Sequence, residues 1–289
     1  AVRKEERFDL IHAHFAWSSG YVALQLKKEL GVPYVVTVHG YDGYDLPYRA
    51  AEWRVRISEV LSGADHIISV SGMNKEKIEG IAGGTPISVI PNGFQSNIFY
   101  ARDKGQARER LGIGADELVL LSVGNLKEIK GHRFLIEAVA KLIEENPRLK
   151  CYIVGEGKER VALEAQIESL GLGEYVRLVG ARAHDEVSQW MSAADLFVLP
   201  SLMEGNPTVM FETLACGTPF VGSSVGGIPD VITPKVGLLS EAGDVDSLAR
   251  AINEALSRRW DRDEILVVAS NYTVSNIARQ ILDVYQKVL

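Results

Sequence analysis

The sequence predicts an α/β protein with parallel sheets and one or two domains. Its length of 289 residues sets that number of domains. Short apolar runs rich in β-branched residues alternate with longer segments of helical periodicity. This order favours parallel strands joined by right-handed crossover helices. A polar stretch, residues 97–114, separates two such runs and indicates a link between domains.

The first run is expected to hold four strands. The strand at 8–14 is followed by a helix that Ser18 or Ser19 would cap and that Gly31 would end. Further strands are expected at 34–38, 66–70 and 87–90, with helices at 50–61 and 71–81.

The second run is expected to hold six strands, near residues 118–123, 150–154, 176–179, 195–199, 220–221 and 237–239. The helices that alternate with them are expected at 132–145, 159–170, 185–193, 208–216 and 245–257. A last helix at 275–289 ends the chain.

The stretch 195–216 carries the strongest functional signal. A buried strand opens it, and a helix is expected to start at Pro207 with Asn206 as its N-cap. The free N–H groups and positive dipole end of this helix would face the carboxyl edge of the sheet, where open α/β sheets bind ligands. Glu204 lies in the loop before the helix, and Glu212 lies more than one turn inside it.

Two carboxylates beside a helix N-terminus suit a ligand that carries both hydroxyl and phosphate groups. Hydroxyls would bind Glu204 and Glu212 while phosphates bind the N–H groups, and a nucleotide sugar has both kinds of group. A second strand-to-helix turn supports this interpretation. There Gly124 would let a ligand approach the backbone, and Lys130 stands next to a helix N-terminus, which suits a diphosphate.

One string of residues resembles a known motif. It begins with Glu204 and residues 205–207, continues to Glu212 and ends with residues 215–219. It is similar to the donor-binding motif of the retaining glycosyltransferases of the GT-B class, family four. In that family the first Glu holds hydroxyls of the sugar and the second holds the ribose. The resemblance therefore implies these roles for Glu204 and Glu212.

The resemblance covers nearly the whole chain and implies the GT-B fold. This fold has two Rossmann-like domains that face each other across a cleft, and the first domain would be incomplete at its N-terminus. Residues 1–98, joined by the C-terminal helix 271–289, would form the partial acceptor domain. Residues 99–270 would form the nucleotide-sugar donor domain. The family's first strands and a Gly-rich loop would precede Ala1.

The resemblance also implies roles for residues outside the Glu204 string. His39 would touch the donor sugar near its reacting carbon, so Glu204 and His39 are the expected catalytic residues. Asn125 stands where the family usually has an arginine that clamps the diphosphate together with the lysine, and Gly180 matches a backbone contact with the nucleotide base. The residues expected to bind the donor are Gly124, Asn125, Lys130, Gly180, Gly205, Asn206, Pro207, Thr208 and Glu212.

The implied activity is transfer of a hexose from a UDP-, GDP- or ADP-sugar to an acceptor hydroxyl, with retention of configuration. The acceptor would be a sugar, a lipid or a small molecule, as in polysaccharide or glycolipid biosynthesis. No cofactor or metal is expected, because Lys130 and the helix dipole would neutralise the departing diphosphate. Two other interpretations stay open, a GT-B nucleotide-sugar epimerase and a non-catalytic nucleotide-binding protein.

Composition and charge argue against other classes. The net charge of -7 argues against a partner nucleic acid, and no apolar run reaches the ~18 residues that a spanning helix needs. Cys151 and Cys216 stand among apolar neighbours, which indicates buried thiols in a reducing, cytoplasmic compartment. No Cys/His cluster has the spacing of a metal site.

Four further polar residues are expected to have structural or surface roles. His12 and His14 alternate along the first strand and point to one side, and both are expected to be structural. Arg54 and Arg56 are expected on a solvated helix face. The alternative for these two arginines is a basic face toward a membrane surface or a lipid acceptor.

Overall fold

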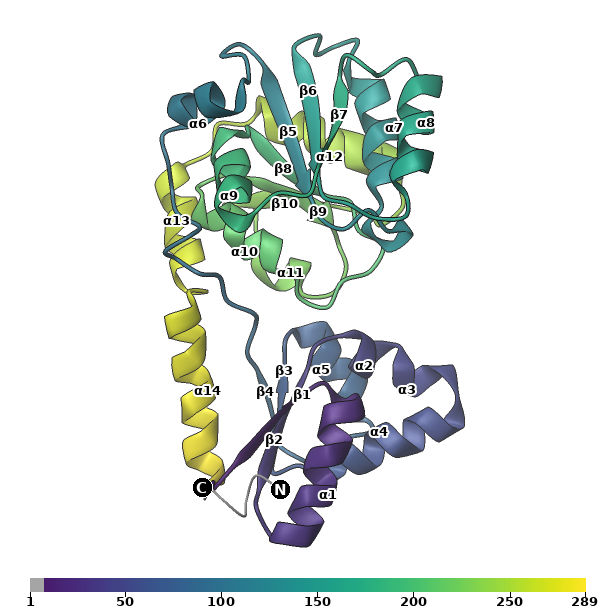
Figure 1. Ribbon diagram of the computed structural model, residues 1–289, viewed down its shortest axis with the longest axis vertical. Helices are drawn as coiled ribbons and strands as arrows, with labels where there is room; N and C mark the ends of the chain where they lie inside the picture. The colour runs from purple at the N-terminus through teal and green to yellow at the C-terminus, as the bar shows by residue number, and fades with distance from the viewer. Residues whose placement is uncertain (1–7) are drawn as a thin grey trace. The chain divides into compact units, whose positions relative to one another are not determined.

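The computed structural model describes residues 8–289 and contains two α/β units, each with its own parallel sheet (Figure 1). Unit 1 comprises the chain up to Asn92 together with residues 275–289, and unit 2 comprises residues 93–274. The predicted α/β class with parallel sheets is confirmed.

The two changes of unit, after Asn92 and after Val274, lie several residues away from the expected positions near 98 and 270. A short parallel pairing between two distant segments explains the difference. The N–H of Phe94 donates to the carbonyl of Tyr272 at 3.0 Å, and the N–H of Val274 donates to the carbonyl of Phe94 at 3.0 Å. These bonds hold both segments within unit 2.

Unit 1 has a four-stranded parallel sheet in the order β1-β2-β3-β4. Every residue of β2 is buried, because helices cover both faces of the sheet. On one face α14 packs against Val35 and Ile68, and on the other face α1, α4 and α5 pack against Val36 and Ile67. The strands are β1 (Ile11–His14), β2 (Tyr34–Val38), β3 (His66–Ser69) and β4 (Ile87–Val89), and the α-helices are α1 (Tyr21–Leu30), α2 (Tyr41–Tyr44), α3 (Leu46–Arg49), α4 (Ala51–Gly63), α5 (Gly72–Glu79) and α14 (Val274–Val288).

Unit 2 has a six-stranded parallel sheet in the order β10-β9-β8-β5-β6-β7. Side chains of β5 alternate between two cores: Val119 and Leu121 pack with α9, α10 and α13, and Leu120 packs with α7, α8 and α12. The strands are β5 (Leu118–Val123), β6 (Leu149–Val154), β7 (Val176–Gly180), β8 (Leu196–Leu199), β9 (Phe220–Ser223) and β10 (Gly237–Ser240). The α-helices are α6 (Lys104–Leu111), α7 (His132–Leu142), α8 (Arg160–Ser169), α9 (His184–Ala193), α10 (Thr208–Ala215), α11 (Ile228–Val231), α12 (Val245–Ser257) and α13 (Arg262–Ser270).

The direction of winding in unit 2 reverses beside β5. From β5 the chain continues to β6 and β7 on one side, and it then returns to place β8 on the other side. The helix after β5, α7, covers one face of the sheet, and the helix after β8, α10, covers the other face. The diverging loops of such a switch point leave a crevice at the carboxyl ends of the two strands, where α/β proteins bind ligands.

Three α-helices of unit 2, α6, α11 and α13, were not predicted from the sequence, nor were the four-residue helices α2 and α3 of unit 1. The polar stretch 97–114 contains α6, which buries only Ala107 and Arg108 and therefore shows little periodicity. The N-cap residues Asp103 and Asp261 accept backbone N–H bonds at the starts of α6 and α13, and they are the local signals for these helices. Among residues 8–289, no helix has the length and apolar character needed to cross a bilayer.

Asp195, directly before β8, joins α6 to the centre of the unit 2 sheet. Its carboxylate accepts hydrogen bonds from Arg108 Nη2 at 2.7 Å, from the N–H of Val119 at 2.6 Å and from Lys104 Nζ. Arg108 is buried and also donates to two backbone carbonyls. Loss of the carboxylate would therefore leave a buried guanidinium and a backbone N–H without their acceptor.

We predict that Asp195→Ala lowers the free energy of unfolding of unit 2 by about 3 kcal/mol, as for other buried ion pairs that lose one partner. The matched control is Glu264→Ala, which removes an exposed ion pair with Lys235 and should cost less than about 1 kcal/mol. Urea denaturation of both variants measures the difference. Equal costs would contradict the anchoring role of Asp195.

Candidate functional site

The candidate site lies in unit 2, where the loops after β5 and β8 meet at the switch point. Lys130 ends a short 3₁₀ turn in the first loop, and Glu204 lies in the second. The N–H of Leu202 donates to the carbonyl of Ile129 at 2.8 Å and ties the two loops together. The Nζ atom of Lys130 donates to Glu204 Oε1 at 2.7 Å. The structure thus joins two motifs that are 74 residues apart in the chain.

Gly131 allows the two loops to approach this closely. Its φ is +67°, and an added Cβ would lie 2.0 Å from the carbonyl oxygen of Pro200. Both the positive φ and the contact exclude a side chain. Gly131 therefore holds Lys130 against the loop that carries Glu204.

Glu204 is fixed by its neighbours from two sides. It is 9% exposed, and its Oε1 accepts a second hydrogen bond, from Ser201 Oγ at 2.6 Å. The turn at Gly226 lies against its backbone, since an added Cβ there would be 2.2 Å from the carbonyl oxygen of Glu204. The N–H of Gly227 also donates to the carbonyl of Gly205 at 2.8 Å. The carboxylate is therefore held in one place before any ligand arrives.

Ser201 was not predicted to be a site residue. The local signal for it is a serine three residues before a glutamate, a spacing typical of local side-chain pairing at loops and helix starts. Here the pairing joins the serine hydroxyl to the carboxylate of Glu204. Ser201 is fully buried, so its hydroxyl acts on Glu204 and not on solvent.

Helix α10 starts one residue later than expected. Thr208 is its first residue and Pro207 is the N-cap, with no side-chain cap, so the prediction of Asn206 as N-cap is wrong. The proline ring fixes φ near -65°, which suits either position, and the sequence cannot distinguish them. Because no side chain caps α10, its first N–H groups stay available to an anionic group.

Glu212 lies on α10 and is half-buried. Burial raises the pKa of its carboxyl from 4.5 to about 7. A carboxyl group with this pKa is partly protonated at neutral pH. Hydroxyl donors such as those of a ribose would stabilise its charged form and lower its pKa again.

The loop after β5 holds the other expected donor-binding groups. The N–H of Gly124 donates to the carbonyl of Val154 at 3.0 Å, and the N–H of Leu126 donates to the carbonyl of Glu156 at 2.9 Å, so the loop is fixed to the end of β6. The side chain of Asn125 is exposed between these two bonds. The structure thus brings Gly124, Asn125, Lys130 and Glu204 to one edge of the sheet.

Gly180 lies farther from this group. It ends β7, which is two strands away from β5 in the sheet, and its φ is +90°. Its carbonyl accepts a hydrogen bond from the N–H of Gly155 at 3.0 Å. A contact of Gly180 with the base of a nucleotide stays a prediction.

His39 follows β2 in unit 1 and is half-buried. Its Nε2 lies 2.8 Å from Nδ1 of His14, and the ring of Phe15 packs beside it at a centroid distance of 4.7 Å. Burial, and secondarily His14, lowers the pKa of His39 to about 4, so the ring is neutral at pH 7. A neutral imidazole can donate one hydrogen bond and accept another.

A buried carboxylate, Asp42, shapes the loop that carries His39. It accepts hydrogen bonds from the N–H groups of His39 and Gly40, both at 3.1 Å, and of Ala16 at 2.7 Å. Asp42, which acts on the backbone of the loop, was not predicted to have a role at the site. The contact of His14 with His39 was not predicted either.

His12 has a structural role, as expected. Its Nδ1 lies 2.6 Å from the hydroxyl of Tyr285 on α14, and its Nε2 lies 2.7 Å from the hydroxyl of Thr37. The ring therefore fixes α14 to the edge of the unit 1 sheet.

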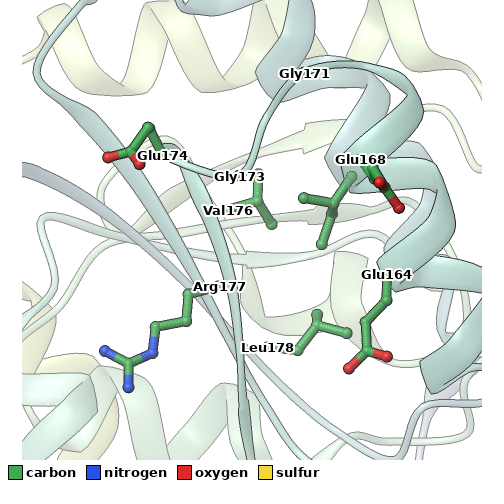
Figure 2. Close-up of a pocket in the computed structure, with 9 residues that line it drawn as sticks. Glu164, Glu168, Gly171, Gly173, Glu174, Val176, Arg177 and Leu178 are labelled. Carbon is green, nitrogen blue, oxygen red and sulfur yellow. The ribbon is translucent and has the colours of Figure 1, made fainter.

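A shallow pocket of about 500 Å³ lies away from these residues, between α8 and the edge strand β7 (Figure 2). None of the expected site residues lines it. Three carboxylates, Glu164, Glu168 and Glu174, surround it with one guanidinium, Arg177. This charge pattern disfavours a phosphate ligand. Among residues 8–289, no group of three or more His, Cys, Asp or Glu side chains has the arrangement of a metal site.

Two family models match the chain. The model described as glycosyl transferases group 1 matches residues 103–270, and the model described as glycosyltransferase family 4 matches residues 1–97.

Related proteins match over most of the chain. D-inositol 3-phosphate glycosyltransferase of Streptosporangium roseum is 30% identical over 308 aligned positions, which cover 99% of this chain and 71% of that protein. A putative teichuronic acid biosynthesis glycosyltransferase of Bacillus subtilis, TuaC, is 32% identical over 89% of this chain and 62% of its own length.

Solved structures match over 99% of the chain. Sucrose-phosphate synthase from Thermosynechococcus elongatus gives a TM-score of 0.84 at 27% identity, with 75% of that chain covered. Anabaena HepE in complex with UDP-glucose gives a TM-score of 0.79 at 26% identity, with 80% of that chain covered.

We predict that Glu212→Gln stabilises the protein more at high pH than at low pH. The folded state binds more protons than the unfolded state between pH 4.5 and about 7, because burial raises the pKa of the Glu212 carboxyl. Stability therefore falls as the pH rises through this window. Removal of the ionisable group should raise the free energy of unfolding by about 3 kcal/mol at pH 8 and by less than about 1 kcal/mol at pH 5.

Urea denaturation at the two pH values measures this difference. Glu168→Gln is the matched control, because Glu168 is exposed on α8 and its replacement should change the free energy of unfolding by less than about 0.5 kcal/mol. A gain from Glu212→Gln that is equal at pH 5 and pH 8 would mean that Glu212 is not desolvated.

Proposed function

This chain belongs to the family described as glycosyl transferases group 1, and from that membership we propose that it moves a hexose from a nucleotide-diphosphate sugar to an acceptor hydroxyl with retention of configuration. The family makes it a glycosyltransferase. The identity of the donor, the transferred sugar and the stereochemical course belong to the proposal.

One observation carries the proposal: the pair of Lys130 and Glu204 at the switch point of unit 2. A lysine ammonium binds phosphate oxygens, and a carboxylate fixed in place accepts bonds from sugar hydroxyls. A nucleotide sugar supplies both kinds of group at adjacent positions. The complexes of Anabaena HepE with UDP, with UDP and glucose, and with UDP-glucose support UDP-glucose as the first donor to test.

In the proposed complex each residue has a separate task. Lys130 and the N–H groups at the start of α10 would bind the diphosphate, and Glu212 would bind the ribose. Glu204 would hold hydroxyls of the transferred sugar. His39, a neutral imidazole in unit 1, is the candidate for a further sugar hydroxyl.

The proposed reaction proceeds on one face of the sugar. The acceptor oxygen forms a bond to the anomeric carbon while the bond from that carbon to the phosphate oxygen breaks. The acceptor proton passes to an oxygen of the departing diphosphate. Lys130 and the α10 N–H groups neutralise the charge that develops there, and no metal ion or cofactor is assigned a role. Positioning then supplies most of the rate enhancement.

Glu204 suits an orienting role better than that of a nucleophile. A double displacement needs a strongly nucleophilic carboxylate directly below the anomeric carbon. Oε1 of Glu204 accepts two hydrogen bonds, from Lys130 and from Ser201, which lower its nucleophilicity and fix its direction. We therefore assign it to the hydroxyls.

We predict that Glu204→Gln lowers turnover on the order of a hundredfold, because the charged contact with the sugar acts mainly in the transition state. Affinity for the free nucleoside diphosphate should not fall, since the substitution releases Lys130 from its ion pair. A radiolabelled donor with a panel of sugar and lipid acceptors measures turnover, and calorimetry measures nucleotide affinity. Glu168→Gln, an exposed glutamate on α8, is the control. Equal turnover in parent and variant would remove Glu204 from the mechanism.

We predict that Asn125→Arg tightens binding of the nucleoside diphosphate at low salt, roughly fivefold or more. A guanidinium at this exposed position can bind two phosphate oxygens at once. The gain should shrink as the salt concentration rises. Asn253→Arg on α12 adds the same charge to an exposed position of unit 2 and should change the affinity little. An unchanged affinity for Asn125→Arg at low salt would show that this loop does not face the phosphates.

A further inference from the structure

His132, the first residue of α7, is a buried polar side chain. It is 3% exposed, and neither ring nitrogen has a hydrogen-bond partner among residues 8–289. The rings of His12, His39 and His66 each have at least one. A buried polar group without a partner is unfavourable and calls for an explanation.

The ring of His132 faces the space in front of Gly124. A Cβ added to Gly124 would have His132 Cε1 at 3.9 Å, Lys130 Cδ at 3.9 Å and His132 Nε2 at 4.0 Å as its nearest atoms outside the adjoining residues. These are ordinary contact distances, so packing does not require a glycine there. Both the imidazole edge of His132 and the stem of Lys130 therefore lie within about 4 Å of this position.

The imidazole is uncharged at neutral pH. Burial, and secondarily the charge of Lys130, lowers the pKa of His132 to about 4. A neutral ring has one N–H donor and one acceptor nitrogen. It can therefore donate a hydrogen bond to an anion without adding a buried charge beside Lys130 and the N-terminus of α7.

We propose that His132 is a further donor-binding residue, whose Nε2–H donates to a phosphate oxygen of the nucleotide diphosphate in front of Gly124. The proposal rests on the proposed function, because it concerns the same nucleotide sugar. Lys130 Nζ is held by Glu204 in the structure, and its stem borders the same space as the imidazole. A diphosphate that draws Lys130 away from Glu204 would open that space and reach both groups. His132 would then supply the neutral donor and Lys130 the charge.

The test compares His132→Leu with the parent in the full 289-residue chain. Calorimetry first finds which of UDP, GDP and ADP the parent binds, and the matching nucleoside is then titrated. We expect His132→Leu to lower affinity for the diphosphate tenfold or more, as for loss of a hydrogen bond to a charged group. Affinity for the nucleoside should stay within about twofold, because the nucleoside has no phosphate.

The thermal stability of the same variant should stay equal or rise. Leucine replaces two buried nitrogens that have no partner with an apolar side chain of similar size. The control is His66→Leu in unit 1, which should lower thermal stability because it leaves the hydroxyl of Ser88 without its partner, and which should not change nucleotide affinity. His132→Gln, which keeps an N–H donor near the position of Nε2, should retain more diphosphate affinity than His132→Leu.

Three outcomes would overturn the inference. Equal diphosphate affinity in the parent and in His132→Leu would overturn the inference and leave the proposed function unaffected. An equal fall in the affinities for diphosphate and nucleoside would show that His132 only supports the packing. A parent that binds none of the three nucleotides would overturn the proposed function and the inference with it.

A second measurement uses the parent chain and needs no variant. The chain has six histidines, so the ring nitrogens of a sample labelled with ¹⁵N in histidine can be resolved by NMR. We expect one buried ring to shift its Nε2 resonance on addition of the diphosphate and not on addition of the nucleoside. The absence of such a shift would overturn the proposal.

Discussion

The ion pair between Lys130 and Glu204 is the interaction on which the candidate site depends. It spans the switch point of the unit 2 sheet, so it forms only where β8 returns to the side of β5. Two groups that would bind opposite parts of a nucleotide sugar neutralise each other in the structure. A charged group this buried is tolerated because a partner and a hydroxyl satisfy it. The donor would replace one ion pair with two separate sets of charge-assisted contacts.

The supporting geometry follows from this constraint. Gly131 lets the β5 loop reach Pro200, and Gly226 lets a third loop lie against the backbone of Glu204. Neither position tolerates a side chain, so the site is fixed by backbone contacts as well as by the ion pair. Glu212 adds a free-energy cost of ionisation, because its burial disfavours the charged form of the carboxyl that would bind hydroxyls. Ligand hydroxyls that stabilise the charged carboxylate would offset this cost, so ligand binding should raise the free energy of unfolding.

Much of the fold could be predicted from the sequence, since each β-strand of the structure overlaps a predicted one. These strands are short apolar runs bounded by turn residues, and that signal is local. The two longest of the missed helices, α6 and α13, bury few side chains, so their periodicity is weak. The start of α10 was placed one residue early, because a proline satisfies both the N-cap and the first helical position.

Some features of the site could likewise be predicted from local sequence, and others could not. Glu204 and Lys130 could be chosen from local motifs, but their contact could not, because it depends on strand order. His132 gave no signal at all, since a histidine at a helix start is ordinary until its burial and its lack of a partner are known. The contact of His14 with His39 likewise depends on the register between β1 and β2, in which His14 lies opposite Thr37.

A crystal structure of the chain with an intact nucleotide sugar would show whether Lys130 and Glu204 bind separate parts of the donor. We expect Lys130 Nζ within about 3 Å of a diphosphate oxygen and Glu204 within about 3 Å of a sugar hydroxyl, at the carboxyl ends of β5 and β8. A nucleotide sugar bound elsewhere, with Lys130 still paired only to Glu204, would contradict this expectation.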